Sequence, residues 1–393
     1  MVYYGWNRTT PETDGRKYRM LHIEILEKTK RGLRPFVSFP FALYRDNENW
    51  VPPMLKYQYE TLLSKGNALL HDGECRFFML YDDERPVARL LAGVDRRLNE
   101  RLRRNLGYIS LFECEENQEA AALILDAGCS YLKSLKVERV IGPTPPTVGD
   151  FGKGVLVQGF DGPPVFLNPY NPPYYEALFL ASGFTKHRDH LAYYMRLGDF
   201  DFDRLEPIIE RAEQRFGYTI RNVRLSGPDR EKKLRDMVRV LHEAFPENWE
   251  MSPPQLTDIE NALRVLRRVY RPEMTVMAYA GDRPIGLVVS FPDYNELIKK
   301  TGGHLFPLGW ATLLFQKNAI KGARCAMQFV VPEYQNMAVN MAMLCRSVEC
   351  SRRIGIEWVE GSTVDETDAV SVNNTERMGA KIYRVYRQYE KEL

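Results

Sequence analysis

The sequence predicts a mixed α/β protein of the α+β kind, built from two tandem domains that share one fold. The 393 residues suit two to three domains of roughly 150 residues each. Hydrophobic residues make up 44% and aromatic residues 12%, enough for real cores. One order of strands and helices also occurs twice along the chain. We place the domains at residues 1–199 and 200–393, with the boundary in the acidic, turn-rich stretch 198–207.

The first repeat begins at residues 18–29, where apolar and polar residues alternate in part, as in a half-buried strand. Two short helices, a hairpin across an acidic turn and a fourth strand are expected next. A long helix, a strand, a helix ended by Gly183 and a last strand complete it. After the first strand, these elements are expected at 36–46, 51–65, 75–84, 85–97, 107–116, 121–132, 137–143, 172–184 and 190–197.

The second repeat starts near Gly217 and follows the same order. A long helix between its fourth and fifth strands implies that these two strands are parallel, in a sheet that is otherwise antiparallel. The expected elements are 218–225, 231–245, 258–270, a hairpin over 274–291, 323–334, 337–352, 356–364, 369–379 and 381–393.

Composition and charge narrow the class of protein. Lysine and arginine number 54 and acidic residues 52, a net charge of +2, so no nucleic-acid partner is expected. The apolar stretches are far shorter than the roughly 20 residues of a transmembrane helix, and the opening residues contain no apolar signal core. Six cysteines without a C-x-x-C pair fit reduced thiols. We therefore expect a cytoplasmic protein.

One motif resembles a known family. Residues 330–340 read V-V-P-E-Y-Q-N-M-A-V-N. They are similar to the GNAT (Gcn5-related N-acetyltransferase) pattern, in which a bulged strand ends in V-x-P-x-x-[QR]-x-x-G-x-[GA] and opens a helix. The resemblance implies that acyl-CoA or acetyl-CoA is a co-substrate, because a helix N-terminus offers N–H groups to a diphosphate. The implied cofactor-binding residues are Val330, Val331, Gln335, Asn336, Met337, Ala338, Val339 and Asn340.

The chain departs from the family pattern at several positions. Ala338 and Asn340 stand where glycines are usual, which crowds the phosphate-binding backbone. The family tyrosine that protonates the leaving thiolate aligns with Thr375, which becomes a candidate catalytic residue. The matching junction of the first repeat, 115–119, has no glycine and three carboxylates that would repel a diphosphate. We expect the first domain not to bind coenzyme A.

A narrower resemblance covers nearly the whole chain. Residues 36–46, 49–53, 159–164 and 168–175 are similar to a bacterial tandem-GNAT group that includes ceramide synthase-like proteins. The resemblance implies a small-molecule or lipid amine as the acyl acceptor. The loop 302–315 favours a hydrophobic partner, and peripheral contact with a membrane is compatible with this loop.

Acyl transfer to an amine needs a base, because an ammonium has no lone pair. Glu360, expected at the end of the strand 356–364, is the candidate; the other reading is a solvated loop carboxylate. A free N–H at Val330 or Val331 would stabilise the negative charge that develops on the thioester carbonyl, unless ordinary strand pairing uses it.

Rigid aromatic residues are the candidates for binding the acceptor. The run 168–175 holds two asparagines, three prolines and three tyrosines, so Asn171, Tyr174 and Tyr175 are candidates, with Trp310 from the loop 302–315. A purely structural turn explains the run equally well. The kinase-like tripeptides 150–152 and 187–189 and the glycine-rich 149–154 lack the rest of their motifs. Histidine spacing gives no metal site, and we expect no metal.

These observations predict an N-acyltransferase that moves an acetyl or longer acyl group from acyl-CoA to an amine by direct attack, with no acyl-enzyme. The alternative is a non-catalytic GNAT-like protein that binds a ligand or partner. A tRNA-dependent aminoacyl transferase ranks last, because the balanced charge does not indicate a basic groove.

Overall fold

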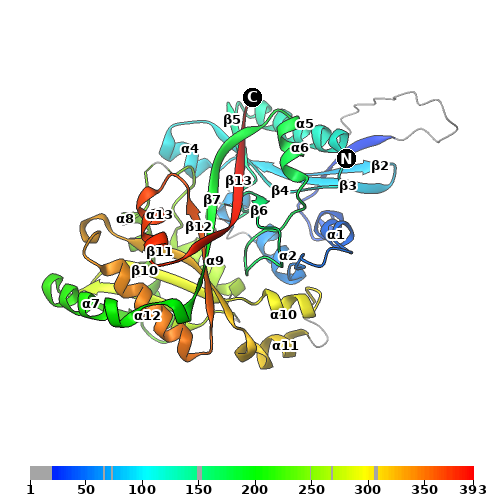
Figure 1. Cartoon of the computed structure of the whole chain (residues 1–393). Coiled ribbons are helices and arrows are strands. Elements are labelled where there is room, and N and C mark those ends of the chain that lie inside the picture. Colours follow the sequence, from blue (N-terminus) through cyan, green and yellow to red (C-terminus); the bar gives the residue numbers. More distant parts are fainter. Residues whose placement is uncertain are drawn as a thin grey trace. The chain divides into compact units, whose positions relative to one another are not determined.

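The computed structural model describes residues 20–64, 67–71, 74–147, 153–247, 249–266, 269–304 and 309–393, which form two compact units (Figure 1). Unit 1 comprises Met1–Pro163, Pro169–His190 and Val385–Leu393, and unit 2 comprises Pro164–Asn168 and Leu191–Arg384. The units therefore interleave along the chain, unlike the consecutive domains 1–199 and 200–393 that the sequence predicts. The kinase-like 150–152 and most of 149–154 lie outside the described residues.

The sheet of unit 1 begins with antiparallel pairing between successive strands. The next pair is parallel through Leu106–Tyr108 and Arg139–Ile141, as the intervening helix predicts. The last nine residues of the chain complete unit 1, because they pair with β5 and β6. The strands are β1 (Leu21–Leu26), β2 (Cys75–Asp82), β3 (Arg85–Gly93), β4 (Leu106–Cys114), β5 (Arg139–Gly142), β6 (Val155–Gln158) and β13 (Lys381–Glu392).

Alternation along β2 separates two cores in unit 1. Phe78 and Leu80 pack in the cluster that includes the buried face of α5 (Gln118–Ser134), together with α6 (Tyr175–Ala181). Phe77 and Met79 pack in the cluster of α1 (Arg34–Leu43), α2 (Leu55–Leu63) and α3 (Ala68–His71). Figure 1 shows these helices on the two sides of the sheet. Each buried large apolar side chain contributes roughly 1.5–3 kcal/mol.

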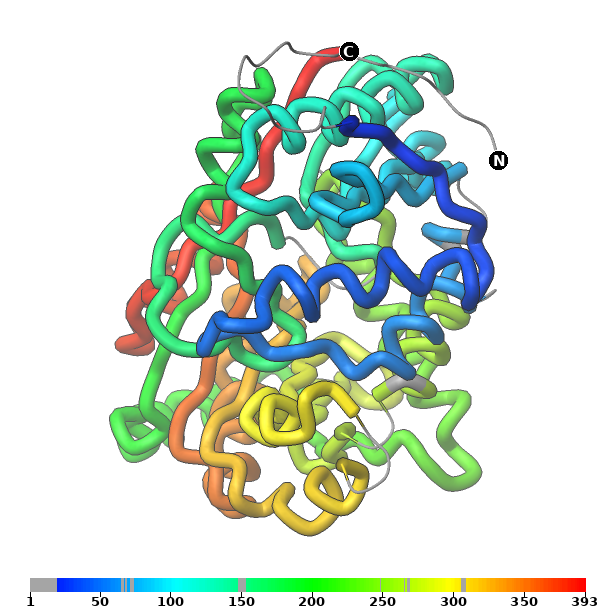
Figure 2. The backbone as a smooth tube through the Cα atoms, turned by 90° about the vertical axis from the view of Figure 1, so that its right-hand side faces the viewer, coloured from blue at the N-terminus to red at the C-terminus, as the bar shows by residue number. Residues whose placement is uncertain are grey.

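Unit 2 repeats the arrangement. Strands β8 (Tyr218–Asn222), β9 (Thr275–Ala280), β10 (Arg283–Pro292) and β11 (Gly322–Val330) pair antiparallel in that order, and β11 pairs in parallel with β12 (Trp358–Asp365). Helices α8 (Arg230–Glu243) and α12 (Val339–Arg353) both pack on β10. Figures 1 and 2 also show the shorter helices of this unit. These are α9 (Leu256–Leu266), α10 (Asn295–Lys300), α11 (Gly309–Phe315) and α13 (Ala369–Arg377).

One long helix and several short elements were not predicted. Helix α7 (Phe202–Phe216) covers most of the stretch 198–207, which the sequence analysis took for a turn-rich boundary. The Asp201 carboxylate accepts a hydrogen bond from the Arg204 N–H, so this acidic residue caps the helix. Gly217 then ends the helix in a left-handed conformation. The short helix α4 (Arg96–Leu102) was not predicted either. It follows Asp95, which caps it, and aspartate is equally typical of a turn. Strand β7 (Thr185–Arg196) begins five residues earlier than expected.

Candidate functional site

Strand β11 carries a bulge and then separates from its parallel neighbour. The register with β10 shifts so that Val289 faces Met327 and Ser290 faces Cys325, which leaves Ala326 as the extra residue. The parallel ladder with β12 runs only from Gly322 to Cys325, whereas the ladder with β10 continues to Val330. The bulge that the family pattern led us to expect is therefore present, and the two parallel strands diverge beyond it.

The backbone between β11 and α12 turns through two left-handed residues. Asn336 has φ 63° and Ala338, the N-cap of α12, has φ 57°. A residue with a Cβ pays about 1–2 kcal/mol in this conformation, whereas glycine does not. Ala338 thus keeps the backbone geometry of glycine at a position where the family pattern has one.

The start of α12 has no side-chain cap. Asn117, Asp201 and Asp368 cap α5, α7 and α13 through their side chains, but Ala338 makes no such bond. A helix of 15 residues with no capping side chain presents its positive end and N–H groups to an anion. The left-handed turn thus leads into a helix whose N-cap residue forms no side-chain hydrogen bond.

The other residues of the junction are held by local bonds. Gln335 donates to the Val330 carbonyl (3.2 Å), and the Tyr218 hydroxyl donates to the Met337 carbonyl (3.1 Å). The Gln328 amide donates to the Asn340 side chain. The Val331 N–H donates to the Ile285 carbonyl (3.0 Å), so strand pairing uses it. For Val331 the expectation of a free N–H is wrong.

The carboxylate of Glu360 is fully buried within β12, at 0% exposure. It accepts hydrogen bonds from the Asn168 amide and the Tyr383 hydroxyl, both residues of unit 2. Asn168 also donates to the Ser362 hydroxyl (3.1 Å). The alternative reading of Glu360 as a solvated loop carboxylate is therefore wrong, and so is its expected place at the strand end.

Burial sets the electrostatics around Glu360. Loss of solvation raises the pKa of this carboxyl, and the Ser362 hydrogen bond and the nearby Arg324 and Arg384 guanidinium groups oppose the rise. Arg324 is itself buried, and it donates to the Ser362 hydroxyl (2.8 Å) and carbonyl (3.0 Å). A carboxyl with a raised pKa can take up a proton closer to neutral pH than a solvated one.

A short segment from the first half of the chain completes this cluster. Asp293 accepts hydrogen bonds from the N–H groups of Phe166 (2.9 Å) and Asn295 (3.1 Å). Asn295 donates to the Pro164 carbonyl (2.7 Å), so Pro164–Asn168 is fixed on unit 2 and Asn168 reaches Glu360. Burial raises the pKa of Asp293 to about 7, although these backbone hydrogen bonds lower it. Neither Asn168 nor Asp293 is among the site residues that the sequence predicts; the asparagine- and proline-rich run 168–175 was the available signal for Asn168.

The predicted acceptor-binding residues fall in different units. Asn171 and Tyr174 are in unit 1. The Asn171 side chain accepts a hydrogen bond from the Leu156 N–H (2.7 Å) and donates one to the Leu156 carbonyl (3.1 Å). The Tyr174 hydroxyl donates to the Cys114 carbonyl (2.8 Å). For Asn171, the structural-turn reading accounts for these bonds. Trp310 lies on α11 in unit 2.

Thr375, the residue aligned with the family's acid, lies within α13. Its hydroxyl donates to the Ser371 carbonyl (2.7 Å), a bond within the helix that occupies its single proton. A role as the acid would require this bond to break.

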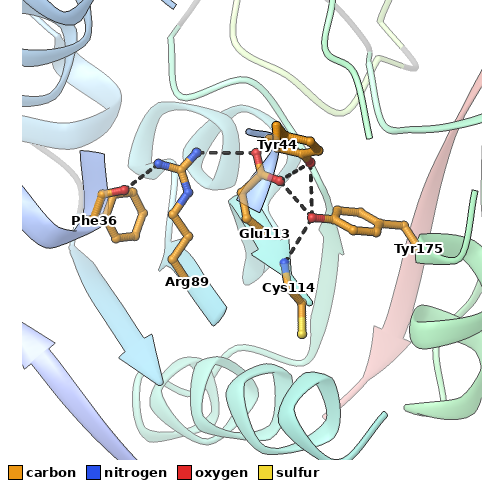
Figure 3. Close-up of polar contacts among 6 residues, drawn as sticks. All are labelled: Phe36, Tyr44, Arg89, Glu113, Cys114 and Tyr175. Carbon is orange, nitrogen blue, oxygen red and sulfur yellow. Dashed lines mark hydrogen bonds and ion pairs between the residues drawn. The ribbon is translucent and has the colours of Figure 1, made fainter. Parts of the chain in front are cut away.

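Unit 1 contains a buried polar network at the end of β4 (Figure 3). Tyr175 donates to the Glu113 carboxylate (2.7 Å) and accepts from the Cys114 N–H (3.0 Å). Tyr44 also donates to Glu113, and Arg89 lies 3.4 Å from it. Burial raises the pKa of Glu113 and of both tyrosines and lowers that of Arg89, so it disfavours the charged form of each group.

The registers of the two units show which atoms correspond. The Glu115 N–H donates to the Val87 carbonyl (3.1 Å) on β3, just as Val331 donates to β10. The preceding residues, Cys114 and Val330, therefore occupy equivalent places. In unit 1 the Tyr175 hydroxyl accepts a hydrogen bond from the Cys114 N–H, and Asn117 caps the helix that follows. Unit 1 thus fills this junction with its own side chains.

Among the described residues, no group of three or more His, Cys, Asp or Glu is arranged to hold a metal ion. In the same part of the chain, no helix has the length and apolar character needed to cross a bilayer.

Two curated proteins resemble the chain over nearly its whole length, whereas no protein-family model matches. Protein YghO of Escherichia coli K12 is 27% identical over 375 residues, covering 93% of this chain and 94% of that protein. Bacterial ceramide synthase of Caulobacter vibrioides is 25% identical over 379 residues, covering 93% and 96%. The resemblance to the group of ceramide synthase-like proteins is therefore confirmed.

Solved structures with the same fold are GNAT proteins. A tandem GNAT protein from the clavulanic acid biosynthesis pathway matches with TM-score 0.55 and 10% identity, over 95% of this chain and 98% of that one. A fungal glucosamine N-acetyltransferase region gives 0.59 and 12%, over 96% of this chain and 39% of that one. A GNAT from Sphaerobacter thermophilus gives 0.50 and 11%, over 95% of each. The predicted tandem, mixed α/β GNAT fold is confirmed.

Proposed function

We propose that this protein, which has the GNAT fold in tandem, is an N-acyltransferase that moves an acetyl or longer acyl group from acyl-CoA to an amine. The observation that carries the proposal is the junction of β11 and α12. There a bulged strand leaves its neighbour, turns through left-handed Ala338 and opens a helix without a side-chain cap.

Coenzyme binding is assigned to the eight residues of this junction. The N–H groups at the start of α12 would hold the diphosphate, and the edge of β11 from Ala326 to Val330 would pair with the pantetheine arm. Val330 keeps the candidate N–H for the developing oxyanion, since strand pairing uses that of Val331. The methyl of Ala338 and the Gln328-bound side chain of Asn340 narrow the phosphate position compared with a glycine pattern.

The reaction is direct attack on the thioester. The amine nitrogen forms a bond to the carbonyl carbon, the carbon–sulfur bond breaks, and the amine proton passes to a base. We assign Glu360 as that base, because its burial raises its pKa and Tyr383 and Asn168 orient it. The leaving thiolate takes a proton from an acid; Thr375 is the candidate by resemblance, once its bond to Ser371 is released.

The acceptor is proposed to be a long-chain amine. The support is the name of one relative, bacterial ceramide synthase, whose similarity extends over 93% of this chain. In unit 2, Trp310 remains a proposed contact of the acceptor. In unit 1, Asn171, Tyr174 and Tyr175 remain separate candidates for such a contact. For Tyr175 the proposal competes with its bonds to Glu113 and Cys114.

Unit 1 is proposed not to bind coenzyme A, so that each chain binds one molecule. The support is that Tyr175 and Asn117 satisfy the N–H groups that a coenzyme would need. The carboxylates of Glu115 and Glu116 add repulsion for a diphosphate.

A non-catalytic, ligand-binding protein is the second candidate. The observation that favours it is the occupied hydroxyl of Thr375, together with the crowded position of Asn340. Coenzyme binding without turnover of any amine would support this second candidate.

Thermal stabilisation by coenzyme A tests the proposal. At 100 times its dissociation constant, a ligand adds about 2.7 kcal/mol to the stability of the folded state, and the melting temperature rises by several degrees. Acetyl-CoA and palmitoyl-CoA should both produce the rise. Ala338→Glu should abolish it, because the new carboxylate lies at the diphosphate position.

Ala369→Glu is the matched control, because it makes the same substitution near the N-terminus of another helix: Ala369 is the first residue of α13, and Ala338 directly precedes α12. Its response to coenzyme A should equal that of the unmodified chain. An unchanged response in Ala338→Glu would place the coenzyme elsewhere, and no response of the unmodified chain to millimolar coenzyme would refute the transferase.

A further inference from the structure

Helix α11 exposes an unusual amount of apolar surface. Trp310, Leu314 and Phe315 are 44%, 49% and 75% exposed, and we call these three residues the α11 patch. The spacing of four residues puts Trp310 and Leu314 on one face of the helix, and Phe315 follows directly at its C-terminal end. The other large exposed apolar residues of the described chain stand on separate elements: Met20, Leu180, Ile208, Val370 and Ile382.

Lysines flank the α11 patch. Lys299 and Lys300 end α10, which contacts α11 (Figure 2), and Lys317 follows Phe315 after one residue. Residues 295–321 contain four lysines and one glutamate, a net charge of +3. Because the whole chain carries only +2, this segment is a locally basic region of a nearly neutral protein.

We propose that the α11 patch and its lysines dock the protein on an anionic lipid bilayer. Tryptophan, leucine and phenylalanine enter the boundary between headgroups and acyl chains, and lysines beside them meet the negative surface. Apolar residues with adjacent positive charge are the combination that such a surface binds.

A second copy of the chain is a poorer occupant. A stable symmetric dimer buries about 800 Å² on each partner, more than three partly exposed side chains supply. A two-fold interface centred on the patch would also bring Lys299, Lys300 and Lys317 of one copy near those of the other. An anionic bilayer neutralises the same lysines.

Flotation with vesicles tests the inference without coenzyme or amine, so its result is independent of the proposed activity. The full chain should float with vesicles of 70% phosphatidylcholine and 30% phosphatidylglycerol, and much less with pure phosphatidylcholine. The double variant Leu314→Ser and Phe315→Ser should bind at least about tenfold more weakly. Ile208→Ser, which changes a residue of similar exposure (51%) on α7, should bind like the unmodified chain.

Charge reversal gives a second measurement. Lys299→Glu with Lys300→Glu should weaken binding, and the matched pair Lys232→Glu with Lys233→Glu on α8 should not. Binding should also fall between about 0.1 M and 1 M salt, as the screening length shortens from about 10 Å to 3 Å.

Three results would overturn the inference: no flotation of the unmodified chain, equal flotation of the serine variant, or an equal loss with Ile208→Ser. Light scattering after size exclusion tests whether a second copy of the chain covers the α11 patch instead. A dimer that the serine substitutions convert to a monomer would assign the patch to a second copy and also refute the bilayer.

Discussion

Replacement of Ala338 by glycine should stabilise the protein. Ala338 holds φ 57° at the start of α12, where its Cβ costs about 1–2 kcal/mol. Glycine removes this cost but returns about 0.4–1 kcal/mol of backbone entropy to the unfolded chain. The midpoints of the two ranges give an expected net gain of about 0.8 kcal/mol, or a rise in melting temperature of about 2–3 °C for a unit of this size.

Differential scanning calorimetry, with Ala342→Gly as the control, measures this gain. Ala342 lies in the interior of the same helix and is 3% exposed, so its replacement by glycine should cost about 1 kcal/mol or more. The two variants should thus shift the melting temperature in opposite directions. If Ala338→Gly lowers it as Ala342→Gly does, residue 338 is not left-handed and our account of the junction fails. Ala338→Gly should also increase the stabilisation by coenzyme A.

Two further predictions concern buried carboxyls of unit 2. Glu360→Gln should lower turnover by about 100-fold or more, whereas Glu113→Gln, which changes another buried carboxyl in unit 1, should leave turnover unchanged; full activity of Glu360→Gln would remove Glu360 as the base. Asp293 titrates near pH 3.8 when unfolded and near 7 when folded, so stability should fall as pH rises between these values, by at most about 4 kcal/mol. Asp293→Asn cannot ionise and should flatten this pH dependence in urea titrations; an unchanged slope would contradict the assignment.

The order of elements could be predicted because apolar periodicity and turn residues are local signals. The hairpin 274–291 appears as β9 and β10, and the helix after 330–340 appears as α12. Helix α7 was missed because aspartate and proline are typical of both turns and helix starts. Only the structure shows that Asp201 begins a helix here and not a turn.

The candidate site could be predicted in part. The junction proposed to bind the cofactor is contiguous in sequence, so a motif was enough to predict its bulged strand and the helix that follows. The surroundings of Glu360 were not predictable, because Asn168 is 192 residues away and its contact depends on the fold. Burial of a carboxylate likewise depends on neighbours that local composition does not reveal, and the same holds for the network of Tyr44, Glu113 and Tyr175.

The division of the chain between the units affects how the protein is made and dissected. Val385–Leu393 supplies strand pairing to unit 1, and Pro164–Asn168 is bound within unit 2. No single cut yields both halves intact, and a fragment ending near residue 199 lacks its closing strand. During synthesis unit 1 therefore stays incomplete until Val385–Leu393 has been added.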